Sequence, residues 1–216
     1  MKKMIAAAAA IILTAGLCGC AGGSGTVSAV ITETQDGSSI SAAGLNITLP
    51  QDWEAYVGKD VYEKLYEGSE GGYDSADDLK KSYEDNGTSY LVYAVNSEQT
   101  AMLSFSALKI TTDENGERLS AEEFARTNHD TSVITFQASG LKIANSGFSE
   151  ESIGGRSGYL SKYEVYSDEE TSQLLMGQSE FIFEQDGSLY SLQGYYHSPE
   201  AGQQTSDILS GITAAE

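Results

Sequence analysis

Few side chains in this 216-residue sequence could act as nucleophiles, general bases or soft metal ligands. The only imidazoles are those of His129 and His197, which are too far apart in sequence for a paired metal-ligand motif. The nearest match to a hydrolase nucleophile turn, Gly155-Arg156-Ser157-Gly158, lacks the second glycine at the required place. The only thiols belong to Cys18 and Cys20. The sequence therefore points to these two thiols as the candidates for covalent chemistry.

The run Leu17-Cys18-Gly19-Cys20 has the order typical of the end of a bacterial lipoprotein signal. In such a signal the last cysteine, here Cys20, takes the lipid and begins the mature protein. Lys2 and Lys3 would supply its positive start, and residues 5–17 are apolar but too few to span a bilayer. A soluble secreted protein and an uncleaved membrane helix are the alternatives. We expect a protein anchored by lipid to the cell membrane, facing the extracytoplasmic side.

Charge and cysteine content restrict the classes of partner. The chain has 32 acidic against 12 basic residues, a net charge of −20 that becomes more negative if the signal is removed. Such a surface repels nucleic acid and anionic headgroups, so we expect neither as a partner. The charge fits solubility outside the cell, or attraction of a basic partner or divalent cations. With Cys18 removed in the signal peptide and Cys20 lipidated, we expect no disulfide in the folded part.

We predict three segments: a signal peptide over 1–19, a lipidated cysteine with a flexible tether over 20–43, and one globular domain over 44–216. The tether is predicted from its glycine, serine and threonine content, which offers too little apolar surface to offset the entropy of ordering. The domain should open with a strand in which Leu45, Ile47 and Leu49 alternate with polar residues, ending at Pro50.

The remaining elements follow from periodicity and capping residues. Ser120 and Glu123 form a capping box, and the helix that they start ends either near Asp130 or at Ser139, because residues 131–135 favour a strand. The other expected helices are a short one within 54–72, one from Asp74 or Ser75 to Asn86-Gly87, and one from Ser198-Pro199 that carries Ile208, Leu209 and Ile212. The expected strands are 89–96, 101–111, 141–148, 156–166, 173–184 and 188–197, with a hairpin turn at Gln185-Asp186-Gly187.

This order predicts an α+β domain with a single antiparallel sheet of six to seven strands and helices on both faces, an α/β/α sandwich. It resembles the PsbP-like family, which includes the Mog proteins and many small bacterial lipoproteins. The resemblance rests on the opening strand 45–50 with Asp52-Trp53, and on the run 181–196 followed by the helix around 207–212. It covers about 44–213 and implies a non-enzymatic accessory or binding protein, without any catalytic or metal residue to carry over.

Aromatic residues are the best candidates for binding a partner. The chain has 13 tyrosines against 6 phenylalanines, and rings with a polar end suit protein or carbohydrate surfaces. The candidate residues are Trp53, Tyr195, Tyr196 and His197. The alternatives are that Trp53 plugs the core at the sheet rim and that the tyrosines line a sheet beneath its helices.

We expect no metal and no cofactor. Asp74, Asp77 and Asp78 suit the start of a helix better than a cation site, and residues 113–117 suit a turn because they lack the spacing of a calcium loop.

Two functions from different classes remain. The first is a surface-anchored accessory or protein-binding module of the cell envelope, a monomer with an unidentified envelope partner or ligand. The alternative is an envelope carbohydrate- or peptide-processing enzyme that uses paired carboxylates, which would place two carboxyl groups roughly 5–10 Å apart in a pocket.

Overall fold

The computed structural model describes residues 28–35, 37–69, 72–110, 112, 116–167 and 173–215. The predicted signal peptide and Cys20 lie outside the described residues, as do positions 113–115 of the predicted acidic turn. The described residues form an α+β fold, which confirms the predicted class. They contain two antiparallel sheets rather than the single sheet that the sequence predicts.

The larger sheet has seven strands in the order β4-β5-β6-β10-β9-β8-β7. Each strand runs antiparallel to its neighbours, because most are joined by hairpins. Their bounds are Trp53–Val57 (β4), Thr88–Asn96 (β5), Ala101–Leu108 (β6), Lys142–Ile153 (β7), Arg156–Tyr166 (β8), Leu174–Gln185 (β9) and Ser188–Tyr196 (β10).

The smaller sheet shows that part of the predicted tether is folded. Its order is β1-β2-β3-β11, with bounds Val30–Thr34 (β1), Gly37–Ala42 (β2), Leu45–Pro50 (β3) and Thr213–Ala214 (β11). Ile40 and Ala42 of β2 are buried beside Leu45 and Ile47 of β3. The prediction of a flexible tether up to residue 43 is therefore wrong for the strands at 30–34 and 37–42. These two strands contain few large apolar side chains. Small side chains at alternate positions nevertheless fit beneath the larger sheet.

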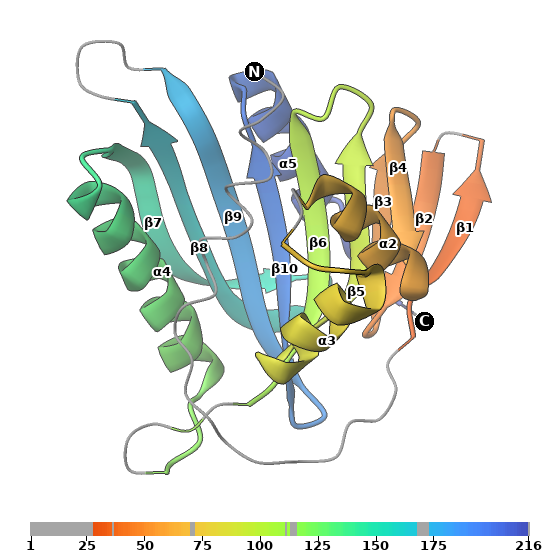
Figure 1. Ribbon diagram of the computed structural model, residues 1–216, viewed down its shortest axis with the longest axis horizontal. Helices are drawn as coiled ribbons and strands as arrows, with labels where there is room; N and C mark the ends of the chain where they lie inside the picture. The colour runs from red at the N-terminus through yellow and green to blue at the C-terminus, as the bar shows by residue number, and fades with distance from the viewer. Residues whose placement is uncertain are drawn as a thin grey trace.

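Four helices flank the larger sheet within the described part of the chain (Figure 1). Their bounds are Lys59–Gly68 (α2), Ala76–Asp85 (α3), Ala121–Ala138 (α4) and Pro199–Ser210 (α5). Helix α4 packs on β7, β8 and β9, while α2 and α3 pack on β4 and β5 of the same face, called here the front face. Helix α5 and the smaller sheet cover the opposite, back face. Helices on both faces agree with the prediction, but the second sheet adds to the back layer.

Helix α4 resolves the alternative that the sequence left open, because it continues to Ala138. Ser120 caps it: its Oγ accepts a hydrogen bond from the Glu123 amide, and the Glu123 carboxylate accepts one from the Ser120 amide. Beyond Asp130, Phe136 is buried against the sheet. Packing of this face stabilises helix in a segment whose β-branched residues favour strand.

Local signals placed the other predicted elements with one exception, although β6 ends at Leu108 and β7 continues to Ile153. Ser75 caps α3 and Ser198 caps α5, as predicted. Asp186 and Gly187 have φ values of 50° and 76°, the left-handed pair that a two-residue β9–β10 hairpin requires. The exception is 53–57, which was expected to lead into a helix and instead forms the edge strand β4. Pairing with β5 places Trp53 and Val57 over the back core.

Candidate binding site

The two faces of the central strands differ sharply in polarity. On the back, strands β6, β9 and β10 contribute Phe105, Phe181, Phe183 and Leu192 to the main core. Period-two alternation puts their neighbours on the front face. These front-face neighbours are mostly polar, and most are buried: Ser104 and Ser106 of β6, Gln178 and Glu180 of β9, and Ser191 and Gln193 of β10.

Glu180 is the chemically unusual residue of this face, with only 2% of its surface exposed. Its Oε1 accepts hydrogen bonds from Ser191 Oγ and from Gln193 Nε2, each at 2.7 Å. Burial raises the pKa of this carboxyl above its usual range, and the two hydrogen bonds oppose that rise only in part. A carboxyl held in this way can accept a hydrogen bond when ionised and donate one when protonated.

Three tyrosines from different strands, Tyr90, Tyr163 and Tyr195, share the front face with Glu180. The Tyr163 hydroxyl donates to Gln178 Oε1 at 2.6 Å, and the Tyr195 hydroxyl donates to Gln193 Oε1 at 3.1 Å. Burial raises the pKa of Tyr90, Tyr163 and Tyr195, and the negative charge of Glu180 adds to that rise in each. The tyrosines therefore stay neutral near pH 7, and two of them bond to the glutamines beside Glu180.

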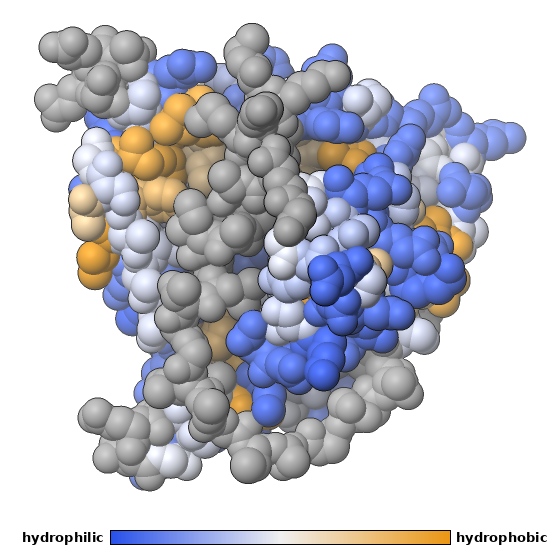
Figure 2. Space-filling model, in the orientation of Figure 1, coloured by the Kyte–Doolittle hydropathy of each residue, from blue (hydrophilic) through white to orange (hydrophobic). Residues whose placement is uncertain are grey.

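The helices flank this polar strip and differ in their contacts with it. Tyr90 packs edge-on against Tyr62 of α2 and Tyr83 of α3, with ring centroids 6.3 and 5.0 Å away. On the α4 side, Phe136 packs on Tyr163, with centroids 6.0 Å apart. In Figure 2 an orange, apolar area lies at the upper left, above α4, whereas the surface over α2 and α3 is blue and white. A second, smaller apolar cluster lies on the α4 side: Phe136, Tyr163, Val165, Met176 and Tyr195, with Met102, Val133, Leu141 and Ile143 against it.

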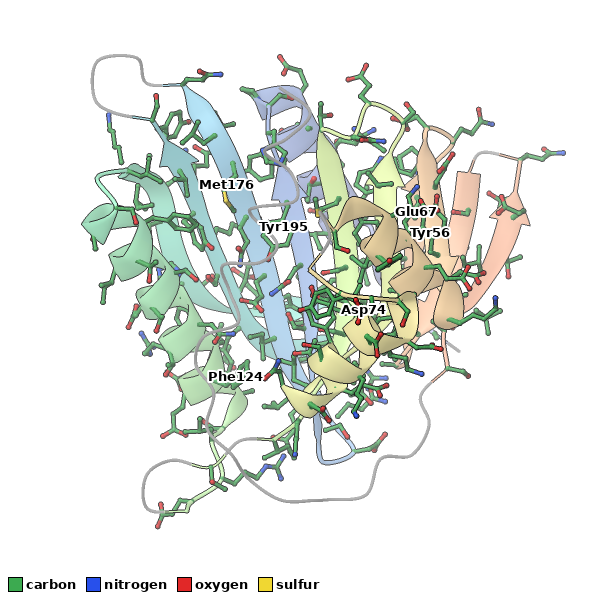
Figure 3. All side chains as sticks on the ribbon, in the orientation of Figure 1. Tyr56, Glu67, Asp74, Phe124, Met176 and Tyr195 are labelled. Carbon is green, nitrogen blue, oxygen red and sulfur yellow. The ribbon has the colours of Figure 1, made fainter. Side chains whose placement is uncertain are left out.

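The structure separates the four residues proposed from sequence. Trp53 is 5% exposed in the back core, where its indole N–H has no hydrogen-bond partner, so it packs as a core plug. Tyr195 is on the front face, close to Met176 on the next strand (Figure 3). Tyr196, the next residue, packs against the back core. These residues therefore do not form one patch, since adjacent residues of a strand point to opposite faces.

Tyr196 and His197 make contacts that hold the fold together. The Tyr196 hydroxyl donates to Glu164 Oε1 at 3.1 Å. His197 Nδ1 lies 2.6 Å from the backbone carbonyl of Leu175, which makes this nitrogen the donor. Of the four predicted residues, Tyr195 belongs to the polar front face, whereas Trp53 and Tyr196 belong to the back core.

His129 of α4 links the helix to two strands. Its Nδ1 lies 2.8 Å from Ser161 Oγ, and its Nε2 lies 3.1 Å from Ser146 Oγ. Burial lowers the pKa of this imidazole. A serine replaces the carboxylate that orients the histidine of a hydrolytic triad, so the arrangement satisfies a buried, neutral imidazole.

Neither a metal site nor a membrane helix is found in the described ranges. No group of three or more histidine, cysteine or acidic residues there could hold a metal ion. Asp78 of the predicted acidic cluster accepts a hydrogen bond from Ser75 Oγ at 2.8 Å at the start of α3. No helix in this part of the chain has the length and apolar character needed to cross a bilayer.

Sequence reasoning missed Glu180 because it looked for acidic residues in clusters. The available signal was its position: Glu180 lies next to Phe181-Ile182-Phe183, in a strand predicted to be covered on both faces. A single acid in such a strand must be buried or interrupt the packing.

Comparisons with known proteins give similarities of fold alone. No protein family and no characterised protein matches the sequence. The solution structure of cyanobacterial PsbP (CyanoP) from Synechocystis sp. PCC 6803 is 12% identical with a TM-score of 0.46, over 91% of this chain and 98% of that one. LpqN, involved in cell envelope biogenesis of Mycobacterium tuberculosis, is 10% identical with a TM-score of 0.41, over 89% and 93%. With TM-scores below 0.5, neither similarity assigns this chain to a family.

Proposed function

We propose that this protein is a lipid-anchored protein of the cell envelope that binds another envelope protein through its front face and catalyses no reaction. The observation that carries the proposal is the polar front face of β6, β9 and β10, where Met102 and Gln193 are partly exposed beside buried serines, Gln178 and tyrosines. Burying polar groups at the centre of a sheet costs free energy that an apolar face would not. A sheet face that stays polar despite this cost in free energy is consistent with a role in recognising a partner.

The chemistry of the strip suits a protein partner. Tyrosine offers a large, rigid contact area with one polar end, and it is common among the residues that dominate binding energy. The glutamines and serines beside Tyr195 add donors and acceptors that fix orientation. Apolar Met102 and Met176 lie next to them and can adapt to a partner's side chains.

The spacing of carboxylates supports binding over an enzyme that uses paired carboxylates. On the described front face of β6, β9 and β10, the acids are Glu180 and Glu184. Four residues of strand separate their Cα atoms by roughly 13 Å, and the Glu180 carboxyl is bonded to Ser191 and Gln193 instead of facing Glu184. Glu184 is also paired with Arg118, with Oε1 2.6 Å from Nη2.

The anchor belongs to the same proposal. Cys20 would carry the lipid, and β1 begins at Val30. Ten residues of chain span at most about 35 Å, so the domain would stay close to the headgroups. A partner in or on the same membrane would then be within reach.

The proposal is tested by crosslinking from defined positions. A photoreactive phenylalanine is placed at Met102 on the front face or, as control, at Val30, which is 57% exposed on β1. The full-length protein is irradiated in the membranes of its own cells, and crosslinked peptides are identified by mass spectrometry. We expect a specific protein crosslinked from Met102 and not from Val30. Identical products from both positions, or none from Met102, would contradict binding through the front face.

A further inference from the structure

The outer edge of β7 is open to solvent. This strand ends the larger sheet, and within the described part of the chain it pairs with β8 alone (Figure 1). It has 12 residues and no proline, and residues 149–152 are exposed. The strand at the other end of the sheet, β4, has 5 residues and lies against β1 of the smaller sheet. A long, exposed edge is a template on which another chain can add a strand.

The turn that follows β7 shows which of its backbone groups face outward. Residues 154 and 155 are glycines with φ values of 58° and 74°, as in a type I′ hairpin turn. Such a turn makes the residues that flank it, Ile153 and Arg156, a hydrogen-bonded pair. The register is regular from there back to residue 147, so alternate residues bond to β8 and the others direct their N–H and C=O away from the sheet. The outward-facing residues are Phe148, Glu150 and Ser152.

The same stretch carries an acid on each face. Phe148 is on the front, beneath the Arg126 guanidinium 4.3 Å from its ring, and Ile153 packs against the back core. Alternation therefore places Glu150 on the front and Glu151 on the back. Neither acid belongs to an ion pair between described residues, and Arg126 is already paired within α4. An added strand would meet one uncompensated carboxylate on each of its faces.

We propose that the outer edge of β7 binds an extended segment of a partner protein that carries two adjacent basic residues. The segment pairs with β7 as an eighth strand. Backbone hydrogen bonds to the outward-facing residues supply affinity, and one lysine or arginine on each face pairs with Glu150 or Glu151. The net charge of −20 favours the approach of a basic segment. This edge is separate from the front face, so the inference does not depend on binding there.

A second copy of this chain fits the edge less well. Antiparallel pairing of two β7 strands centred on Glu150 would bring the acids of both copies together. Like charges that face each other across strands are destabilising, and each copy has a net charge of −20. The acids thus oppose pairing between copies, which is a common role of charge on an edge strand, while they admit a basic strand.

The test measures binding of a defined peptide to the full-length protein in detergent micelles. The probe is acetyl-Thr-Val-Thr-Lys-Lys-Val-Thr-amide, whose β-branched residues favour an extended chain. One control peptide carries glutamate in place of both lysines. The other has a methyl group on every backbone nitrogen, which keeps both charges and removes the donors that strand pairing needs. Fluorescence anisotropy of labelled peptide gives the affinity, and hydrogen exchange of the protein's amides locates the contact.

Two variants separate charge from strand pairing. Glu150→Gln with Glu151→Gln removes the charges and keeps the backbone. Its matched control, Glu98→Gln with Glu200→Gln, removes two exposed acids away from β7. Ser152→Pro keeps the charges and removes one outward N–H, at a kind of position where edge strands accept proline. The methylated peptide makes the same comparison on the wild type, so the test does not depend on the folding of the proline variant.

We expect saturable binding of the lysine peptide, with slower exchange of the outward-facing amides of β7. Binding should be roughly fivefold weaker in the double variant of β7, the effect of one or two cross-strand charge pairs. It should change less than about twofold in the matched control. The glutamate peptide, the methylated peptide and Ser152→Pro should each weaken binding by roughly tenfold or more, because each loses a required part of the contact.

Equal binding of the lysine peptide and its methylated form would mean that charge alone attracts the peptide, and it would overturn strand pairing. Equal weakening in both double variants, or slower exchange in another strand and not in β7, would overturn the site. A dimer of the free protein in sedimentation, with the β7 amides already protected, would assign the edge to a second copy of this chain instead.

Discussion

The ring of Tyr196 on β10 lies directly over Gly177 on β9, its partner across the two strands. A Cβ at Gly177 would collide with Cζ, Cε2 and the hydroxyl oxygen of that ring. The ring also lies against Gly202 of α5, where a Cβ would stand 2.8 Å from Cε2. Two glycines thus leave room for one tyrosine between the sheet and the terminal helix.

Gly177→Ala should therefore destabilise the domain. The added methyl group must displace the Tyr196 ring and with it the contact to α5, at an expected cost of about 1–3 kcal/mol. Urea denaturation measures this cost. The control is Gly147→Ala on β7, where a Cβ would meet nothing within 4 Å, and it should change the free energy of unfolding by less than about 0.5 kcal/mol. Equal effects of the two substitutions would show that the position of the Tyr196 ring does not depend on the absence of a side chain at Gly177.

Asn96→Ala should open the β5–β6 hairpin. Asn96 is 4% exposed, and its Oδ1 accepts hydrogen bonds from the amides of Thr100 and Ala101 at 2.8 and 3.0 Å. Leaving these amides without a partner should cost about 1–3 kcal/mol in the free energy of unfolding. Ser97→Ala in the same turn is the exposed control and should cost little. Unchanged protection of the two amides in hydrogen exchange would contradict this role.

The buried imidazole of His129 should make stability rise with pH. Its pKa is lowered in the folded state, so the unfolded chain binds more protons as the pH falls below about 6.5. Its contribution is therefore present at neutral pH and is lost on acidification. Comparing the free energy of unfolding of the wild type and His129→Gln between pH 5 and 7.5 should show a flatter slope in the variant. Parallel curves would mean that His129 does not titrate on unfolding.

Glu180 should act in the opposite direction. Its pKa is raised by burial, so the folded state keeps a proton that the unfolded state loses above about pH 4.5. Its contribution is fully present below that pH and is lost as the pH rises through the folded-state pKa. Glu180→Gln should remove this loss and become more stable relative to the wild type as the pH rises from 4.5 to 8. A stability difference that does not change with pH would refute a raised pKa.

Cys20→Ala should release the protein from membranes, because the predicted lipid attaches to this thiol. Cys18→Ala is the matched control and should remain membrane-bound, since it changes only the signal peptide. Labelled palmitate and membrane fractionation measure the two outcomes. Label on the Cys20 variant, or loss of label only in the Cys18 variant, would show that the lipid site was misplaced.

The sequence by itself determined the elements whose signals are local. Ser120 with Glu123 placed the start of α4, and Asp186-Gly187 placed the β9–β10 turn. The strand β8 was predicted with the bounds that it has, Arg156–Tyr166. Such features depend on capping hydrogen bonds, backbone φ values and alternation within a few residues, so they can be read without knowledge of distant neighbours.

Only the tertiary structure decided what distant segments contribute. The segments 30–34 and 37–42 look too polar to fold, yet β1 pairs with β2, β2 pairs with β3, and Ile40 and Ala42 join the back core. The helix beyond Asp130 persists because Phe136 packs on the sheet, against its local preference for strand. Alternation along β10 predicts that Tyr195 and Tyr196 face opposite ways, but it does not say that Glu180 and three tyrosines meet beside one of them. Their shared face depends on the order β5-β6-β10-β9-β8 and on the register of the strands, which are set by packing between residues far apart in the chain.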